Sequence, residues 1–276
     1  MMKFDLMFLF RGFILKRLIS PVPKCLVNST SHFWSMSGII NDINNVEVAN
    51  MRTAYKSEHE AFLECHLSSK DPIQQFDAWF KEACNNDKIE EGNKMTIATA
   101  TKEGRPSARM VLLKGYCREG FKFYTNFNSR KGKELKENPY ASLVFYWEPL
   151  NKQVRIDGKV RRLSEEESCK YFHSRPRCSQ IGATVSNQSQ PISSRDVLIK
   201  KQEELELKYQ DESKLIPKPD FWGGYIVIPD QIEFWQGQSN RIHDRIVFRK
   251  LRENETVDQV LLHNGEGDWV YERQQP

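Results

Sequence analysis

The chain has 276 residues, which is enough for one large domain or two small ones. Hydrophobic residues make up 39% of it and charged residues 28%, a composition that supports a folded core. These values exclude a wholly disordered chain, a collagen and a polytopic membrane protein.

The formal net charge is +4, and the excess lies in the first forty residues, which carry five basic side chains and one acidic one. The remaining residues carry 36 side chains of each sign. The body therefore lacks the broad positive field of a non-specific nucleic-acid binder.

The basic, acid-poor leader can be interpreted as a targeting segment similar to a mitochondrial presequence, or as a poorly ordered extension. It has no uninterrupted apolar run of the roughly 18 residues that a membrane span needs. We expect residues 1–50 to form an N-terminal extension and residues 51–276 to form a single domain. The expected location is cytoplasmic, or mitochondrial if the leader is a presequence.

The cysteines and histidines are scattered. None of the six cysteines forms a C-x-x-C pair, which favours free thiols in a reducing compartment. The six histidines also lack metal-ligand spacing, so we expect no structural metal site. The cysteines are Cys25, Cys65, Cys84, Cys117, Cys169 and Cys178.

Four segments have the pattern of helices. Asp71 has the character of an N-cap, Pro72 suits the first helical position, and apolar residues then recur at helical spacing to about Cys84. Ser164 and Glu167 have the spacing of a capping box. The predicted helices are 72–84, 129–137, 164–172 and 196–209.

The other regular segments have the pattern of short strands joined by tight turns. A Pro/Gly linker is predicted at 217–224. This pattern favours an α+β fold, mainly antiparallel β, with helices around a barrel. No G-x-G-x-x-G or P-loop motif is present, which argues against a Rossmann or P-loop nucleotide site. The predicted strands are 95–101, 107–114, 121–126, 141–147, 153–163, 225–228, 232–236, 245–249, 260–263 and 269–272.

Two groups of cations are placed where they could bind anions. Arg109 and Lys114 lie on one predicted strand, and their odd separation places them on opposite faces if the strand is regular. There they could address two different anions or simply solvate one edge. Arg130 and Lys131 open a predicted helix, where the dipole disfavours cations unless an anion is present. This cost favours an anion site there over an ordinary solvated pair.

The segment from Tyr171 to Ser179 offers a phenol, two guanidinium groups and a hydroxyl, the donors that hold a phosphate monoester. The arginines are Arg175 and Arg177. A helix end with exposed arginines explains the same residues equally well, so both interpretations stay open.

The segment 233–248 concentrates charged and aromatic residues around a turn between two apolar strands. A histidine and an arginine there could orient a substrate or adjust its protonation. The cluster does not by itself name a reaction. Its members are Trp235, Arg241, His243, Asp244 and Arg245.

Several long motifs closely resemble the pyridoxine/pyridoxamine 5'-phosphate oxidase family. They are SARMVLLKG (107–115), FYTNFNSRKGKEL (123–135), LVFYWEPLNKQVRIDG (143–158), YFHSRPRCSQIGATVSNQS (171–189), FWGGY (221–225) and IEFWQGQSNRIHDR (232–245). The resemblance covers about residues 51–276. It implies an FMN-binding split β-barrel that works as a homodimer, with each FMN held by both chains.

The resemblance also implies roles for individual residues. Arg109, Arg130 and Lys131 would hold the FMN phosphate, and Arg241 and His243 would lie over the substrate ring as catalytic residues. Ile242 stands where the family usually has Leu. The implied FMN contacts are Arg109, Met110, Val111, Leu112, Tyr124, Thr125, Arg130, Lys131, Gln153, Gln188, Ser189, Trp235 and Arg245. The implied substrate contacts are Lys114, Tyr171, Arg175, Ser179, Arg241, Ile242 and His243, with Arg52 and Tyr55 as a lid.

The implied reaction is oxidation of pyridoxamine 5'-phosphate or pyridoxine 5'-phosphate by O2 to pyridoxal 5'-phosphate, with H2O2 and, from the amine, NH3. This places the chain in vitamin B6 metabolism and salvage. The competing hypotheses are a related split-barrel flavoprotein with a different acceptor, a non-catalytic pyridoxal-phosphate carrier, and a nucleic-acid-binding barrel. The neutral body argues against the last of these.

Overall fold

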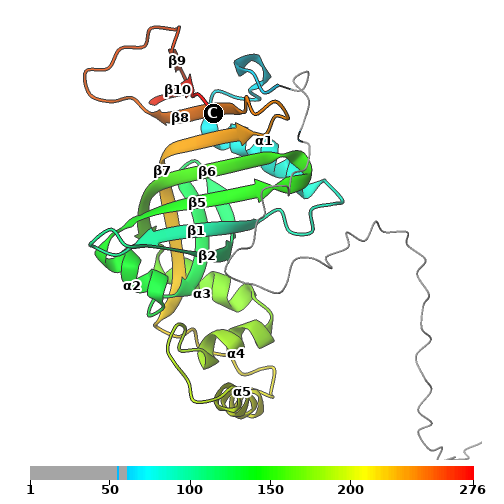
Figure 1. Ribbon diagram of the computed structural model, residues 1–276. Coiled ribbons are helices and arrows are strands. Elements are labelled where there is room, and N and C mark those ends of the chain that lie inside the picture. Colours follow the sequence, from blue (N-terminus) through cyan, green and yellow to red (C-terminus); the bar gives the residue numbers. More distant parts are fainter. Residues whose placement is uncertain (1–54, 56–60) are drawn as a thin grey trace, which may run out of the picture. The chain divides into compact units, whose positions relative to one another are not determined.

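The computed structural model describes Tyr55 and residues 61–276, which belong to one unit, Thr53–Pro276 (Figure 1). The expected extension at residues 1–50 and the expected lid residue Arg52 lie outside the described residues. Among the helices that the structure describes, none is long and apolar enough to cross a bilayer.

The described chain is built on one ten-stranded antiparallel sheet, as the strand pattern predicted. Its order is β2-β1-β5-β6-β7-β8-β10-β9, and β4 pairs with both β3 and β7. Because β4 also lies near β2, the strands curl around an apolar interior. The strands are β1 Lys94–Ala100, β2 Pro106–Leu112, β3 Gly115–Cys117, β4 Gly120–Asn126, β5 Tyr140–Trp147, β6 Lys152–Arg162, β7 Trp222–Gln236, β8 Asp244–Lys250, β9 Leu262–Asn264 and β10 Trp269–Arg273.

Helices cover the barrel and form a second, smaller core. In α1, Asp71 caps the helix by accepting a 2.8 Å hydrogen bond from Ile73 N, as predicted, and Phe76 is fully buried against Phe121 and Phe145. Phe172 on α3 and Trp222 at the start of β7 belong to a separate apolar cluster. The helices are η2 Glu64–His66, α1 Pro72–Cys84, α2 Arg130–Glu137, η3 Glu148–Leu150, α3 Glu165–Ser174, α4 Arg177–Val185 and α5 Asp196–Lys208.

The prediction was wrong along β7. Two strands and a preceding linker were predicted, but Trp222–Gln236 forms one continuous strand. Its register against β6 shifts where Gly158 faces Pro229, which marks a β-bulge. The backbones approach closely there, because a Cβ on Gly158 would lie 2.1 Å from Ile228 O. The bulge accommodates Pro229 and Asp230 within the strand.

The structure differs from the prediction at one further helix and at the start of one strand. Helix α4 was not predicted, because its sequence RCSQIGATV contains glycine and β-branched residues that have low helix propensity. Strand β9 begins only at Leu262, because Val260 and Leu261 lie in a turn where the Asp258 carboxylate accepts their backbone N–H groups.

Candidate active site

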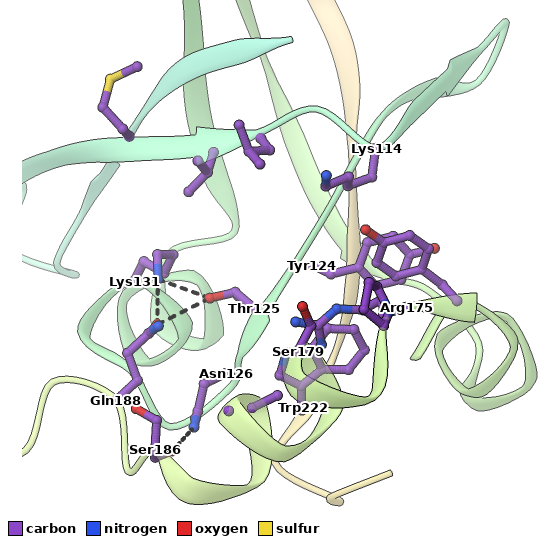
Figure 2. Close-up of a pocket in the computed structure, with 17 residues that line it drawn as sticks. Lys114, Tyr124, Thr125, Asn126, Lys131, Arg175, Ser179, Ser186, Gln188 and Trp222 are labelled. Atoms are coloured by element: carbon purple, nitrogen blue, oxygen red, sulfur yellow. Dashed lines mark hydrogen bonds between the residues drawn. The ribbon is translucent and has the colours of Figure 1, made fainter. Parts of the chain in front are cut away.

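A cleft of about 510 Å³ opens between the barrel and helices α3 and α4 (Figure 2). Strands β2 and β4 form one wall, and α2 and the first residue of β7 contribute to the others. The cleft brings together eleven residues that the resemblance had assigned to cofactor or substrate. They are Met110, Val111, Leu112, Lys114, Tyr124, Thr125, Lys131, Tyr171, Arg175, Ser179 and Gln188.

Arg175 lines this cleft, and one hydrogen-bond donor of its guanidinium has no partner in the described part of the chain. Its guanidinium lies over the Trp222 ring, 4.9 Å from the centroid, and burial lowers its pKa. The Nη1 atom is buried and has no hydrogen-bond partner among the described residues. Since an unpaired buried donor is unfavourable, the geometry fits an anion that accepts from Arg175.

Aromatic rings brace this part of the cleft. Tyr124 and Tyr171 stack with centroids 3.9 Å apart, and Tyr124 also stacks on Trp222 at 5.6 Å. The sequence motif FWGGY contains Trp222, but no site role had been assigned to it. Together the rings fix α3 and its Arg175 C-cap against β4.

The second arginine of this segment has a different environment. Arg177 donates to the backbone carbonyls of Tyr209 at 2.8 Å and Lys214 at 3.1 Å. It thereby ties the start of α4 to the end of α5 and the loop beyond. Arg175 thus lies in the cleft, whereas Arg177 is a half-buried structural residue at the start of α4.

Lys131 is a buried cation at the other side of the cleft. Its Nζ donates to Thr125 Oγ1 at 2.9 Å and Gln188 Oε1 at 2.7 Å (Figure 2). Burial, assisted by the nearby positive charge of Arg109, lowers the pKa of Lys131 to about 8. The ammonium has neutral oxygen partners here and would gain from a phosphate.

The expected relation between Arg109 and Lys114 is wrong, because β2 ends at Leu112 and Lys114 follows the strand. Arg109 turns toward Thr99 Oγ1, at 2.6 Å, and lies 3.5 Å from Glu134. Lys114 instead lines the cleft. The alternation of side chains along a strand therefore could not predict where the Arg109 and Lys114 side chains point.

Glu134 is a further site-forming residue that the sequence did not reveal. It is 4% exposed and accepts from Ser107 Oγ at 2.6 Å and Arg130 Nε at 2.9 Å. Although burial acts in the opposite sense, these hydrogen bonds and one from Thr99 lower the pKa of Glu134. The carboxylate thus holds Arg109 and Arg130 together, while Ser189 Oγ accepts from the Arg130 backbone N–H at 3.2 Å.

A second group of predicted site residues lies at the far end of β7. Gln153, Trp235 and Arg245 are direct cross-strand neighbours on β6, β7 and β8, so they share one face of the sheet. Arg245 forms a 3.1 Å ion pair with Glu233. The aligned row offers an amide, an indole and a guanidinium to a flat ligand.

The turn between β7 and β8 adds the proposed catalytic pair. His243 lies 5.0 Å from Trp235 between ring centroids, and Tyr55 packs edge-on to both at 5.9 and 6.1 Å. Arg241 has a φ of 65°, and Ile242 is 67% exposed. Asp244, which the sequence grouped with them, turns inward and is buried.

The two groups of residues do not meet within one chain. Trp222 lines the cleft and Trp235 lies beside His243, thirteen residues further along the same strand. At about 3.3 Å per residue, that is on the order of 40 Å along the strand. The described lining of the cleft includes neither Arg241 nor His243. Each chain thus carries these predicted residues in two separate groups, which are two candidate half-sites.

Comparison with known proteins finds family matches for two consecutive parts of the chain and close relatives of most of its length. Residues 82–209 match the family described as pyridoxamine 5'-phosphate oxidase, and residues 222–276 match the pyridoxine 5'-phosphate oxidase C-terminal dimerisation region. Pyridoxine-5'-phosphate oxidase of Bos taurus is 56% identical over 255 residues, 92% of this chain and 93% of the relative. Pyridoxine/pyridoxamine 5'-phosphate oxidase of Bombyx mori is 53% identical, over 84% of this chain and 90% of the relative.

Solved structures show the same fold. PhzG from Burkholderia lata 383, in complex with tetrahydrophenazine-1-carboxylic acid, is 28% identical with a TM-score of 0.67, over 78% of this chain and 97% of that one. A pyridoxamine 5'-phosphate oxidase-related, FMN-binding protein from Nostoc punctiforme is 14% identical with a TM-score of 0.54, over 74% and 98% of the two chains. The second likeness concerns the fold alone.

The lowered pKa of Lys131 predicts a pH-dependent cost in the ligand-free protein. Below pH 8 the ammonium is charged in the folded and unfolded states, and its burial is unfavourable. Lys131→Met should therefore raise the free energy of unfolding near neutral pH by about 1–2 kcal/mol. The gain should shrink as pH rises from about 8 toward the unfolded-state pKa of about 10.4, because the folded protein loses this proton first.

Urea unfolding of the ligand-free protein near pH 7 and near pH 10 measures this difference. The exposed Lys133→Met on the same helix is the matched control and should change stability little at either pH. A Lys131→Met protein less stable than the wild type near pH 7 would contradict the account.

Proposed function

This chain belongs to the pyridoxamine 5'-phosphate oxidase family and is an oxidoreductase of vitamin B6 metabolism, and we propose that it oxidises pyridoxamine and pyridoxine 5'-phosphates with FMN as its cofactor. The products are pyridoxal 5'-phosphate and H2O2, with NH3 from the amine. Flavin use follows from the family. FMN as the particular flavin is supported by the fit of the residues.

The observation that carries the substrate assignment is the buried, unpaired Nη1 of Arg175. Lys114, Tyr171 and Ser179 line the same cleft, so two cations and two hydroxyls are available to one anion. A phosphate monoester can accept from all four through three oxygens. The substrate phosphate is therefore assigned to this end of the cleft.

A second phosphate site fits the chemistry of Lys131. Its desolvated ammonium has only neutral partners, and Glu134 holds the side chains of Arg109 and Arg130 at the same helix. Three cations against one carboxylate leave positive charge for the dianionic phosphate of FMN. The Arg130 backbone N–H at the start of α2 lies in the region where the helix dipole favours an anion.

The chemistry that bound flavin supplies is acceptance of a hydride from the substrate C4' carbon, followed by transfer of the electrons to O2. The chain's own residues bind, orient and shield the reactants. On this assignment the Gln153, Trp235 and Arg245 row contacts the cofactor. Arg241 positions the substrate ring, and His243 binds it or adjusts its protonation.

The two half-sites require two chains. The dimerisation region matches residues 222–276, which include β7, β8 and β10 and carry Trp235, Arg241 and His243. We assign each active site in a homodimer to the cleft of one chain and the β7–β8 turn of its partner. Tyr55 beside His243 would then border the substrate from the same chain as the turn.

The two arginines of the 171–179 segment should have different roles, one in substrate binding and one in stability. Arg175→Met removes a phosphate donor, so KM for pyridoxamine 5'-phosphate should rise about tenfold to a hundredfold. Arg177→Met removes bonds to backbone carbonyls, so it should lower the free energy of unfolding by about 1–2 kcal/mol with KM nearly unchanged. Steady-state kinetics and urea unfolding measure the two effects, and an equal KM for both variants would argue against the phosphate assignment.

The proposed function is tested by the absorbance spectrum of the purified protein, followed by O2 consumption with pyridoxamine 5'-phosphate. We expect flavin absorbance and turnover, and a fall in kcat/KM of about a hundredfold for Arg241→Ala and His243→Ala. A colourless protein that binds no added FMN would instead indicate a pyridoxal-phosphate carrier. Bound flavin without turnover would indicate a flavoprotein with another acceptor.

A further inference from the structure

Gln238 lies at the centre of the turn that carries Arg241 and His243. Its side chain is 2% exposed. Its backbone N–H donates to His243 Nδ1 at 3.0 Å, and its carbonyl accepts from the Arg241 N–H at 3.1 Å. Both proposed active-site residues of this turn are therefore hydrogen-bonded to the backbone of one buried glutamine.

The Gln238 side chain is itself fixed by Asp244. Nε2 of the amide donates to Asp244 Oδ2 at 2.8 Å, which also accepts from Phe62 N at 2.9 Å. Asp244 Oδ1 accepts from Arg273 Nη1 at 2.8 Å, and Arg273 pairs with Glu64 at 2.8 Å. The carboxylate is thus held by a turn, by β10 and by the segment before η2. A carboxylate can only accept, so it also fixes which end of the amide faces it.

The bond to His243 determines the proton position on the ring. A backbone N–H can only donate, so Nδ1 must accept and the neutral imidazole carries its hydrogen on Nε2. Trp235 and Tyr55 pack around the same ring. The ring is thus constrained in both tautomer and position, and Nε2 remains as its donor.

We propose that Gln238, held by Asp244, is a positioning residue that fixes His243 as the Nε2–H tautomer and holds the Arg241–His243 turn for catalysis. This inference rests on the proposed function. It extends that function to two buried residues which need not touch substrate or cofactor.

The test compares Gln238→Met with the wild-type holoenzyme. Methionine keeps the length of the side chain but leaves Asp244 without the amide donor, so the turn should loosen. We expect kcat/KM to fall on the order of tenfold, mainly through kcat, with FMN affinity unchanged. Nitrogen NMR of histidine-labelled holoenzyme should show the single Nε2–H form of His243 in the wild type and a mixture of tautomers in the variant.

Gln75→Met is the matched control. Gln75 is also fully buried and accepts from Ser68 N at 2.7 Å, but it lies on α1. The same chemical change there should affect stability while leaving the His243 signal and kcat/KM as they are. Asp244→Asn is a second variant. Its amide N–H2 group would face N–H donors that the carboxylate now accepts from, such as Gln238 Nε2. The turn should therefore loosen and give the same mixture of His243 tautomers.

A double-mutant cycle separates positioning from general destabilisation. In the His243→Ala background, Gln238→Met should lower kcat/KM by clearly less than its roughly tenfold effect in the wild type, because the part of the effect that acts through His243 is already lost. Three results would each overturn the inference. The first is that Gln238→Met lowers kcat/KM by the same factor with and without His243. The second is that the His243 signal is unaltered in both Gln238→Met and Asp244→Asn, and the third is that Gln75→Met causes the same changes.

The NMR signal is recorded without turnover. Failure of the oxidase assay in the wild type would therefore count against the proposed function and not against the tautomer assignment.

Discussion

The continuous strand β7 is the constraint on which the arrangement of the site depends. It pairs with β4 near its start, with β8 near its end and with β6 along most of its length. A strand held in three ladders is stiff, so its two ends cannot approach each other. The Trp222 ring at one end packs against the Arg175 guanidinium, and the Trp235 ring at the other end packs beside His243. The fold thereby gives every chain two half-sites that a homodimer can combine.

The cations of the site fall into two classes that follow from their partners. Arg245 and the Arg109–Arg130 pair are held by buried carboxylates, which fix their positions. Arg175 and Lys131 are desolvated without a carboxylate partner among the described residues, so each retains capacity for a ligand anion. A bound phosphate would offset the cost of this desolvation. Residues 41–276 contain equal numbers of acidic and basic side chains, and this balance does not reveal which cations have a carboxylate partner.

Much of the fold could be predicted from the sequence, because period-two alternation and helix caps are local signals. Asp71 and Ser164 cap their helices where expected, and the sheet is antiparallel. The continuity of β7 could not be predicted, since Pro229 and Asp230 have the local pattern of a turn and only the bulge opposite Gly158 accommodates them. Helix α4 was missed for a similar reason, because its packing against α5 overrides its low propensity.

The site residues were found by resemblance more than by local chemistry. Sequence spacing placed Arg109 and Lys114 on one strand, but the end of β2 separates them. It could not separate Arg175 from Arg177, because their directions depend on contacts of Arg177 with residues more than thirty positions away. Glu134 and Gln238 lie inside the motifs that carry the resemblance, but nothing in the sequence gave them a role, which is recognised only from their burial and hydrogen bonds.

The central claim is that each active site combines the cleft of one chain with the turn of its partner, and purified heterodimers test it most directly. A heterodimer of Arg175→Ala and His243→Ala chains keeps one intact site, so it should have about half the wild-type kcat/KM. A heterodimer of a wild-type chain and a chain with both substitutions should keep less than about a tenth of the wild-type kcat/KM, because each of its sites contains one substitution. The reverse pattern, with kcat/KM largely lost in the first heterodimer and halved in the second, would show that each site is built within a single chain and would contradict the account.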